Sequence, residues 1–223
     1  MNLASVLVAN RGEIVRRVFR TARDMGLRCV AVFVDADADA PFVAEADEAV
    51  RLPDGYLDGA AIIAAALATG ADAIHPGYGF LAENADFVEA VEAAGLVWVG
   101  PPADVVRSMG DKLAAKAAAD AAGVPTLPSS DDPTDAGSIG YPLLVKAVAG
   151  GGGKGMHLVE SADHLDEAVT SAQREALGAF GDSRVFLERY VARSRHLEVQ
   201  ILGDAHGGPV SYTHLTLPTI YSV

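Results

Sequence analysis

Short apolar runs alternate with stretches of helical spacing from Met1 to Gly110. The apolar runs have the length of strands, and they are Val6–Ala9, Cys29–Val34, Ala73–His75 and Leu96–Val99. Between them, apolar side chains recur every three or four residues, which predicts helices at 14–25, 58–69 and 84–94. Strands that alternate with helices are typical of a parallel sheet covered on both faces. We therefore expect an α/β domain in this part of the chain.

The pattern changes after Gly110. An alanine-rich helix is predicted over Lys112–Ala122, and the polar stretch Ser129–Gly140 resembles a linker. Strands are then expected at 143–148, 156–159, 184–191 and 196–202, with one helix at 163–177. This second region reads as an α+β unit.

Composition limits the classes of function. Half of the residues are apolar, which is enough for a real core, and the formal charge of −13 opposes sequence-independent binding to nucleic acid or anionic membranes. The single cysteine, Cys29, lies in an apolar run and is expected to be a small buried side chain. No secretory signal or membrane span is evident, so the sequence predicts a cytoplasmic protein.

A run of four glycines at 150–153 follows the apolar strand that ends at Val148. Glycine amides can turn toward an anion, and Lys146 and Lys154 could meet phosphate charge. A Walker A loop needs Ser or Thr after Gly-Lys, but Gly155 follows Lys154. A dinucleotide fingerprint would follow the first strand, where Asn10-Arg11-Gly12-Glu13 stands instead. With these two motifs excluded, the glycine run is interpreted as a hairpin loop that covers a phosphate group. The alternative is a solvent-exposed flexible loop without a ligand.

Six segments in one order resemble biotin carboxylase, in particular that of bacterial acyl-CoA carboxylase α chains. They are Val8–Ile14, His75–Asn84, Gly100–Pro102, Met109–Lys112, the glycine run and Arg195–Gln200. The resemblance implies a pre-ATP-grasp (Rossmann-like) parallel-sheet domain at 1–110. A truncated α+β ATP-grasp domain with a glycine-loop lid would follow at 111–210, and residues 211–223 would form a tail foreign to the family.

The resemblance also implies a set of ATP contacts. Two lysines would hold the phosphates, glycine amides with a lysine at the loop tip would cover them, and a hinge would read adenine through its backbone. These residues are Lys112 and Lys146; Gly152, Gly153 and Lys154; and Glu188, Arg189, Tyr190 and Val191. His196 would lie near the nucleotide, although a hydrogen-bonded strand histidine is an alternative. The segment from His75 to Phe80 reads as a strand-end turn, since Pro76 and two glycines favour one.

The implied chemistry is ATP-dependent carboxylation of biotin with bicarbonate, and it requires Mg²⁺ and a biotin carrier domain. The expected partners are that carrier, a carboxyltransferase subunit and a second copy of the chain. The family's magnesium carboxylates and catalytic residues would lie beyond residue 210, so we expect no metal site here and a fragment inactive alone. Two alternatives stay open: another ATP-grasp ligase, such as the carbamoyl-phosphate synthase large subunit, or a non-catalytic nucleotide-binding remnant.

Overall fold

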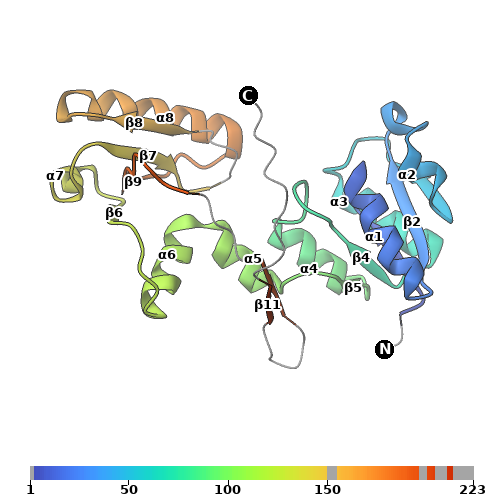
Figure 1. The fold of residues 1–223 in the computed structure, drawn as a ribbon. Helices are drawn as coiled ribbons and strands as arrows, with labels where there is room; N and C mark the ends of the chain where they lie inside the picture. The colour runs from blue at the N-terminus through green and yellow to red at the C-terminus, as the bar shows by residue number, and fades with distance from the viewer. Residues whose placement is uncertain (1–2, 150–154, 196–199, 204–209, 213–223) are drawn as a thin grey trace. The chain divides into compact units, whose positions relative to one another are not determined.

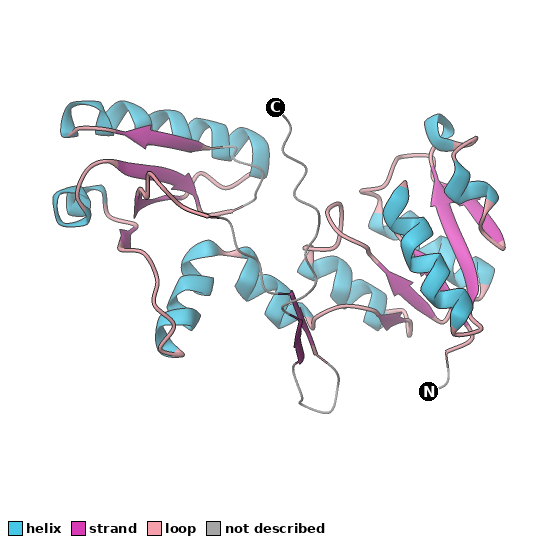
Figure 2. Cartoon of the chain, viewed as in Figure 1, coloured by secondary structure: helices cyan, strands magenta, loops and turns pink. Residues whose placement is uncertain are grey.

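The computed structural model describes residues 3–149, 155–195, 200–203 and 210–212, with side-chain positions for those outside the last two short strands (Figure 1). The chain divides into two compact units, Met1–Gly123 and Val124–Val223. Each unit has its own sheet and its own core, and each is described by itself (Figure 2).

A five-stranded parallel sheet forms the centre of the first unit. Its order is β3-β2-β1-β4-β5, and the strands are β1 (Ser5–Val8), β2 (Arg28–Phe33), β3 (Glu48–Arg51), β4 (Ala73–His75) and β5 (Val97–Trp98). Leu7 pairs with Val30 on one side and with Ile74 on the other, and all three side chains are fully buried. Burial on both faces explains why the central strands read as continuous apolar runs.

Helices cover both faces of this sheet. They are α1 (Glu13–Asp24), α2 (Pro41–Ala44), α3 (Gly59–Thr69), α4 (Ala85–Ala93) and α5 (Ala103–Gly110), with a 3₁₀ turn at Asp35–Asp37. Helix α6 (Lys112–Ala121) follows α5, contacts it and buries none of its own residues. Alternate residues of β1 point to opposite faces. Val6 and Val8 pack with Phe19 of α1, whereas Leu7 packs with Val88 of α4. The α/β architecture expected from the sequence is confirmed.

Capping side chains set the ends of the helices. Asp58 accepts a hydrogen bond from the Ala61 amide, and Asn84 accepts one from the Phe87 amide, each at 2.9 Å. The two helices expected at 58–69 and 84–94 therefore begin one residue later, because the polar first residue of each is its cap. The edge strand β3 was not predicted, and neither were α2 and α5. In β3 the apolar pattern is missing because charged Glu48 and Arg51 flank only two apolar residues at an exposed edge.

The second unit contains an antiparallel sheet covered by one long helix. The sheet order is β6 (Ser129–Ser130), β9 (Val185–Arg189), β7 (Leu143–Ala147), β8 (Met156–Val159). Helix α8 (Leu165–Phe180), preceded by a 3₁₀ turn at Ala162–His164, packs on one face, where Val145, Leu187 and Ala172 are buried together (Figure 1). Strands β10 (Gln200–Leu202) and β11 (Val210–Tyr212) form a separate antiparallel pair.

The prediction of a linker at 129–140 was wrong. That stretch holds β6, a 3₁₀ turn at Pro133–Asp135 and α7 (Ala136–Ile139). Asp132 accepts a hydrogen bond from the Thr134 amide at 2.8 Å, and Ile139 is buried in the core of the unit. Asp132 thus caps the 3₁₀ turn, and burial of Ala136 and Ile139 stabilises the four-residue α7 that follows.

No helix among the described residues is both long and apolar enough to cross a membrane.

Candidate functional site

The crevice in which open parallel sheets usually bind a ligand is filled by the chain's own side chains. This position lies at the C-terminal ends of β1 and β4, where the strand order reverses. The Asn10 side chain, 2% exposed, donates to the carbonyl oxygens of Pro76 and Tyr78, each at 2.7 Å. A Cβ added at Gly77 would lie 2.8 Å from the Asn10 amide nitrogen. The first unit therefore keeps the Rossmann-like layout without the usual space for a nucleotide.

A polar network closes the neighbouring strand end. Arg11 donates two hydrogen bonds to the Asp37 carboxylate, at 2.7 and 2.6 Å, and the Tyr56 hydroxyl donates to the same carboxylate at 2.6 Å. The hydrogen bond from Arg11 lowers the pKa of Asp37 to about 2. Burial and the hydrogen bond to Asp37 raise the pKa of Tyr56 to about 12. The network joins β1 and β2 beyond their last residues, and the sequence reading missed it.

The segment after β4 is a turn, as expected from Pro76 and the glycines. The Gly77 amide donates to Nδ1 of His75 at 3.0 Å, and the Tyr78 hydroxyl donates to the Glu13 carboxylate. Burial lowers the pKa of His75, which keeps this nitrogen free to accept. The arrangement ties β4 to the start of α1 and has a structural role.

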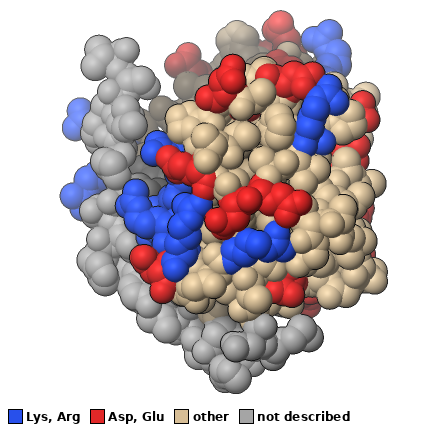
Figure 3. Space-filling view, turned by 90° about the vertical axis from the view of Figure 1, so that its right-hand side faces the viewer, with Lys and Arg blue, Asp and Glu red and all other residues tan. Residues whose placement is uncertain are grey.

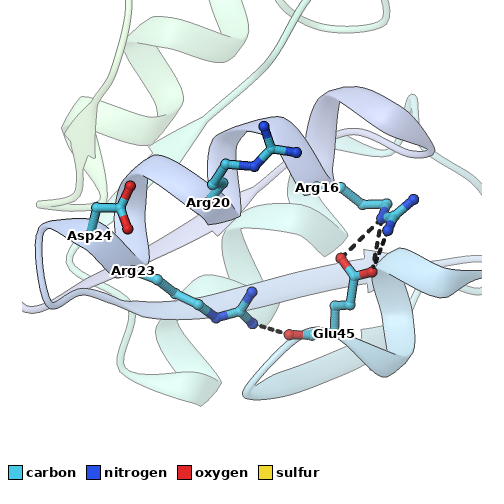
Figure 4. Close-up of a pocket in the computed structure, with 5 residues that line it drawn as sticks. All are labelled: Arg16, Arg20, Arg23, Asp24 and Glu45. Atoms are coloured by element: carbon cyan, nitrogen blue, oxygen red, sulfur yellow. Dashed lines mark hydrogen bonds and ion pairs between the residues drawn. The ribbon is translucent and has the colours of Figure 1, made fainter.

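Helix α1 carries four arginines, Arg16, Arg17, Arg20 and Arg23, and such a group can be a solvated face or a phosphate-binding patch. Arg16 donates to both carboxylate oxygens of Glu45, at 2.9 and 3.0 Å, and Arg23 donates to the Glu45 backbone carbonyl (Figure 4). Arg20 lies between them on the helix, and its charge also acts on the Glu45 carboxylate. On the face drawn in Figure 3, basic and acidic side chains lie next to one another. These ion pairs favour the solvated-face interpretation over a basic phosphate patch.

A paired lysine and glutamate lie on the face of the second sheet that points away from α8. The Lys146 ammonium is 2.8 Å from a Glu188 carboxylate oxygen, and the two side chains are 21% and 12% exposed. The ammonium also lies 5.6 Å from the centre of the Phe186 ring. Beside this pair, Met156 and Leu158 of β8 are exposed. The face thus combines one partly buried cation with apolar surface, which suits an aromatic base joined to an anionic tail.

The proposed adenine hinge, Glu188–Val191, follows from β9 into the next loop. The Arg189 amide donates to the Pro128 carbonyl at 2.9 Å, and the Tyr190 amide donates to the Pro142 carbonyl at 3.2 Å. The Val191 amide has no partner among the described residues. Of the hinge amides beyond Glu188, only that of Val191 is left to meet a base.

The structure does not place the other predicted ATP-binding residues beside Lys146 and the hinge. Gly152, Gly153, Lys154 and His196 lie outside the described residues. Lys112 is the first residue of α6, after its cap Asp111, and it belongs to the first compact unit. Its approach to the same phosphates as Lys146 stays a prediction. Within the part of the chain that the structure describes, no three His, Cys, Asp or Glu side chains are grouped to hold a metal ion.

Two protein-family models match the chain, one over the part with the parallel sheet and one over the part with the antiparallel sheets. Residues 2–106 match the family described as biotin carboxylase, N-terminal domain. Residues 111–215 match the carbamoyl-phosphate synthase L chain, ATP binding domain. Biotin carboxylase from Haemophilus influenzae is 47% identical, over 93% of this chain and 50% of that protein. The chain belongs to the biotin carboxylase family.

Other members of the family agree. The mitochondrial methylcrotonoyl-CoA carboxylase subunit alpha of Glycine max is 50% identical over 92% of this chain and 30% of that protein. Among solved structures, a biotin carboxylase–βγ-ATP complex from Campylobacter jejuni has a TM-score of 0.91 and 42% identity, over 94% of this chain and 50% of that one. The biotin carboxylase domain dimer of Hydrogenobacter thermophilus 2-oxoglutarate carboxylase, with MgADP and bicarbonate, has a TM-score of 0.91 at 41% identity, over 95% of this chain and 49% of that one.

These matches favour the biotin carboxylase family over the carbamoyl-phosphate synthase large subunit. The relatives are biotin-dependent carboxylases, so the match to the carbamoyl-phosphate synthase ATP-binding domain reflects a fold that this family shares. The chain spans 30 to 50% of the length of the curated relatives named above. What those whole proteins do therefore enters only as a proposal.

Proposed function

We propose that the chain supplies the pre-ATP-grasp domain and part of the ATP-binding domain of a biotin carboxylase, the ligase that carboxylates carrier-bound biotin with bicarbonate and ATP. The observation that carries this is the Lys146–Glu188 pair on the sheet face away from α8. A partly buried ammonium beside apolar surface can hold a nucleotide phosphate, because its charge is fixed and little screened by water.

The described residues have separate tasks in this proposal. Lys146 neutralises phosphate charge, and Glu188 holds its ammonium in place until a phosphate arrives. The Val191 amide and the neighbouring carbonyl groups read the adenine edge. Bound ATP supplies the phosphoryl group for activating bicarbonate, and positioning with charge neutralisation is the main protein contribution to such chemistry. No described residues fit Mg²⁺, so no role in metal binding is assigned to them.

The wider assignments belong to the same proposal. Lys112, Gly152, Gly153, Lys154 and His196 would complete the nucleotide contacts, and the domain limits would be 1–110 and 111–210. The partners would be a biotin carboxyl carrier domain, a carboxyltransferase subunit and a second copy of the chain, in the cytoplasm. The family membership and the dimer seen in the Hydrogenobacter thermophilus structure support these assignments.

Calorimetric titration with ATP and GTP tests the nucleotide site. We expect ATP to bind at least tenfold more tightly than GTP, and Lys146→Met to weaken ATP binding by about tenfold, because one charge-assisted phosphate contact is lost. Equal heats for the two nucleotides would refute the site.

A double variant separates phosphate binding from stability. Lys146→Met removes one ion-pair contact of the largely buried Glu188 carboxylate, which costs about 1–3 kcal/mol of folding free energy. The added change Glu188→Gln removes that buried charge, so we expect it to restore stability without restoring ATP affinity. If the double variant binds ATP as tightly as Glu188→Gln alone, which carries the same loss of negative charge, Lys146 does not contact phosphate.

A further inference from the structure

Strand β8 follows the glycine run at 150–153, which we call the glycine segment. The first described residues after this segment, Gly155–His157, contact α8, and we call them the exit stem. Gly155 is buried, and its carbonyl accepts a hydrogen bond from the Ala147 amide at 2.9 Å. It has φ of 65°, and a Cβ added there would lie 3.1 Å from the Ala147 Cβ and 3.6 Å from the Ala172 carbonyl oxygen. Only glycine fits this point without strain, so contact with α8 fixes where β8 begins.

One carboxylate of α8 makes two polar contacts to the exit stem. Glu175 accepts a hydrogen bond from the Gly155 amide through Oε2 at 3.2 Å, and its Oε1 lies 3.1 Å from Nε2 of His157. Gly155 packs against Ala172 and Ala176 of α8, and His157 lies two residues further along, so a single carboxylate of this helix reaches both. The Glu175 side chain is 49% exposed. An ion pair this exposed adds little to global stability, and its effect is to fix local orientation.

The exit stem lies next to the lysine of the proposed phosphate site. Met156, the residue between the two partners of Glu175, is paired in register with Lys146 across β7 and β8. A displacement of the stem therefore changes the strand against which Lys146 is aligned. It also changes the point from which the glycine segment departs, which is one residue before Gly155.

We propose that Glu175 is a positioning residue for phosphate binding, and this inference rests on the proposed nucleotide site. Glu175 does not touch the ligand. It acts through Gly155 and His157, because it sets the position of the strand end that joins the glycine segment to the Lys146 face.

Affinities for ATP and for adenosine, measured by calorimetry on the full chain, test this role. Adenosine carries the same base and sugar without phosphate. We expect Glu175→Ala to raise the dissociation constant for ATP by about fivefold, as for the loss of one ordinary hydrogen bond, and to leave adenosine binding unchanged. Glu175→Gln keeps an acceptor oxygen for the Gly155 amide and should restore most of the ATP affinity. His157→Ala should give a smaller loss in the same direction.

A charge-matched control is needed because loss of any negative charge favours binding of an anion to an acidic chain. Glu167→Ala, on the same helix but without a hydrogen bond or ion pair to Gly155 or His157, provides it and should not weaken ATP binding. Amide exchange gives an independent readout, and it should be faster at Gly155 in Glu175→Ala than in the wild-type chain.

Two negative results have different meanings. If the wild-type chain binds neither ligand, the proposed nucleotide site fails and this role fails with it, even when exchange at Gly155 responds to Glu175→Ala. If the wild-type chain binds ATP but Glu175→Ala weakens ATP and adenosine equally, or weakens neither, the positioning role alone is overturned.

Discussion

The buried carboxylate of Asp37 gives a quantitative test of the first unit. Its pKa lies at about 2, against an ordinary value of 3.8, because it accepts hydrogen bonds from Arg11 and Tyr56. One pKa unit corresponds to about 1.4 kcal/mol, so the ionised carboxylate stabilises the folded state by about 2 kcal/mol. Arg11 is half exposed, and solvent screening makes this figure an upper value. Asp37→Asn keeps the shape and removes the charge, so we expect a loss of about 1–2 kcal/mol at pH 7.

The pH dependence has a definite sign. A depressed carboxyl pKa contributes stability above the unfolded value near 4, and that contribution is lost as pH falls toward about 2. The wild-type advantage over Asp37→Asn should therefore be constant above pH 5 and should shrink steadily below pH 4. Urea unfolding can be followed by the fluorescence of Trp98, the single tryptophan, which is buried in this unit.

Asp35→Asn is a matched control, because Asp35 pairs with Arg51 on the surface with both side chains more than half exposed. Screening by water makes such a pair nearly neutral for stability. Equal losses from Asp37→Asn and Asp35→Asn, or a wild-type advantage that is undiminished at pH 2.5, would refute the buried-network argument.

Two further predictions concern the turn after β4. Gly77→Ala should destabilise the unit more than Gly79→Ala, by about 1 kcal/mol or more, because both residues have φ of 66° but only Gly77 is crowded by Asn10; equal unfolding midpoints would contradict this. By NMR titration His75 should have a pKa below its ordinary 6.5, since burial disfavours the imidazolium. Its contribution to stability is present above 6.5 and is lost as pH falls, so a measured pKa at or above 6.5 would contradict the burial argument.

Local sequence determined much of the secondary structure and the family. Apolar runs long enough to be buried on both faces marked the central strands, and polar first residues such as Asp58 and Asn84 marked where helices begin. These signals are local, because strand burial and helix capping each involve a few neighbouring residues. The order of six motifs then pointed to biotin carboxylase, which the comparisons confirmed.

Tertiary structure decided which side chains meet. Asn10 reaches residues 66 and 68 positions away, and Lys146 meets Glu188 across 42 positions. The contacts of Glu175 with the exit stem likewise join a helix to a strand that precedes it by about twenty residues. No local pattern marks such partners, because a polar side chain on a helix or strand looks the same in sequence whether it faces water or a buried amide. Strand register and helix packing place these groups within hydrogen-bond distance, and only the folded chain specifies them.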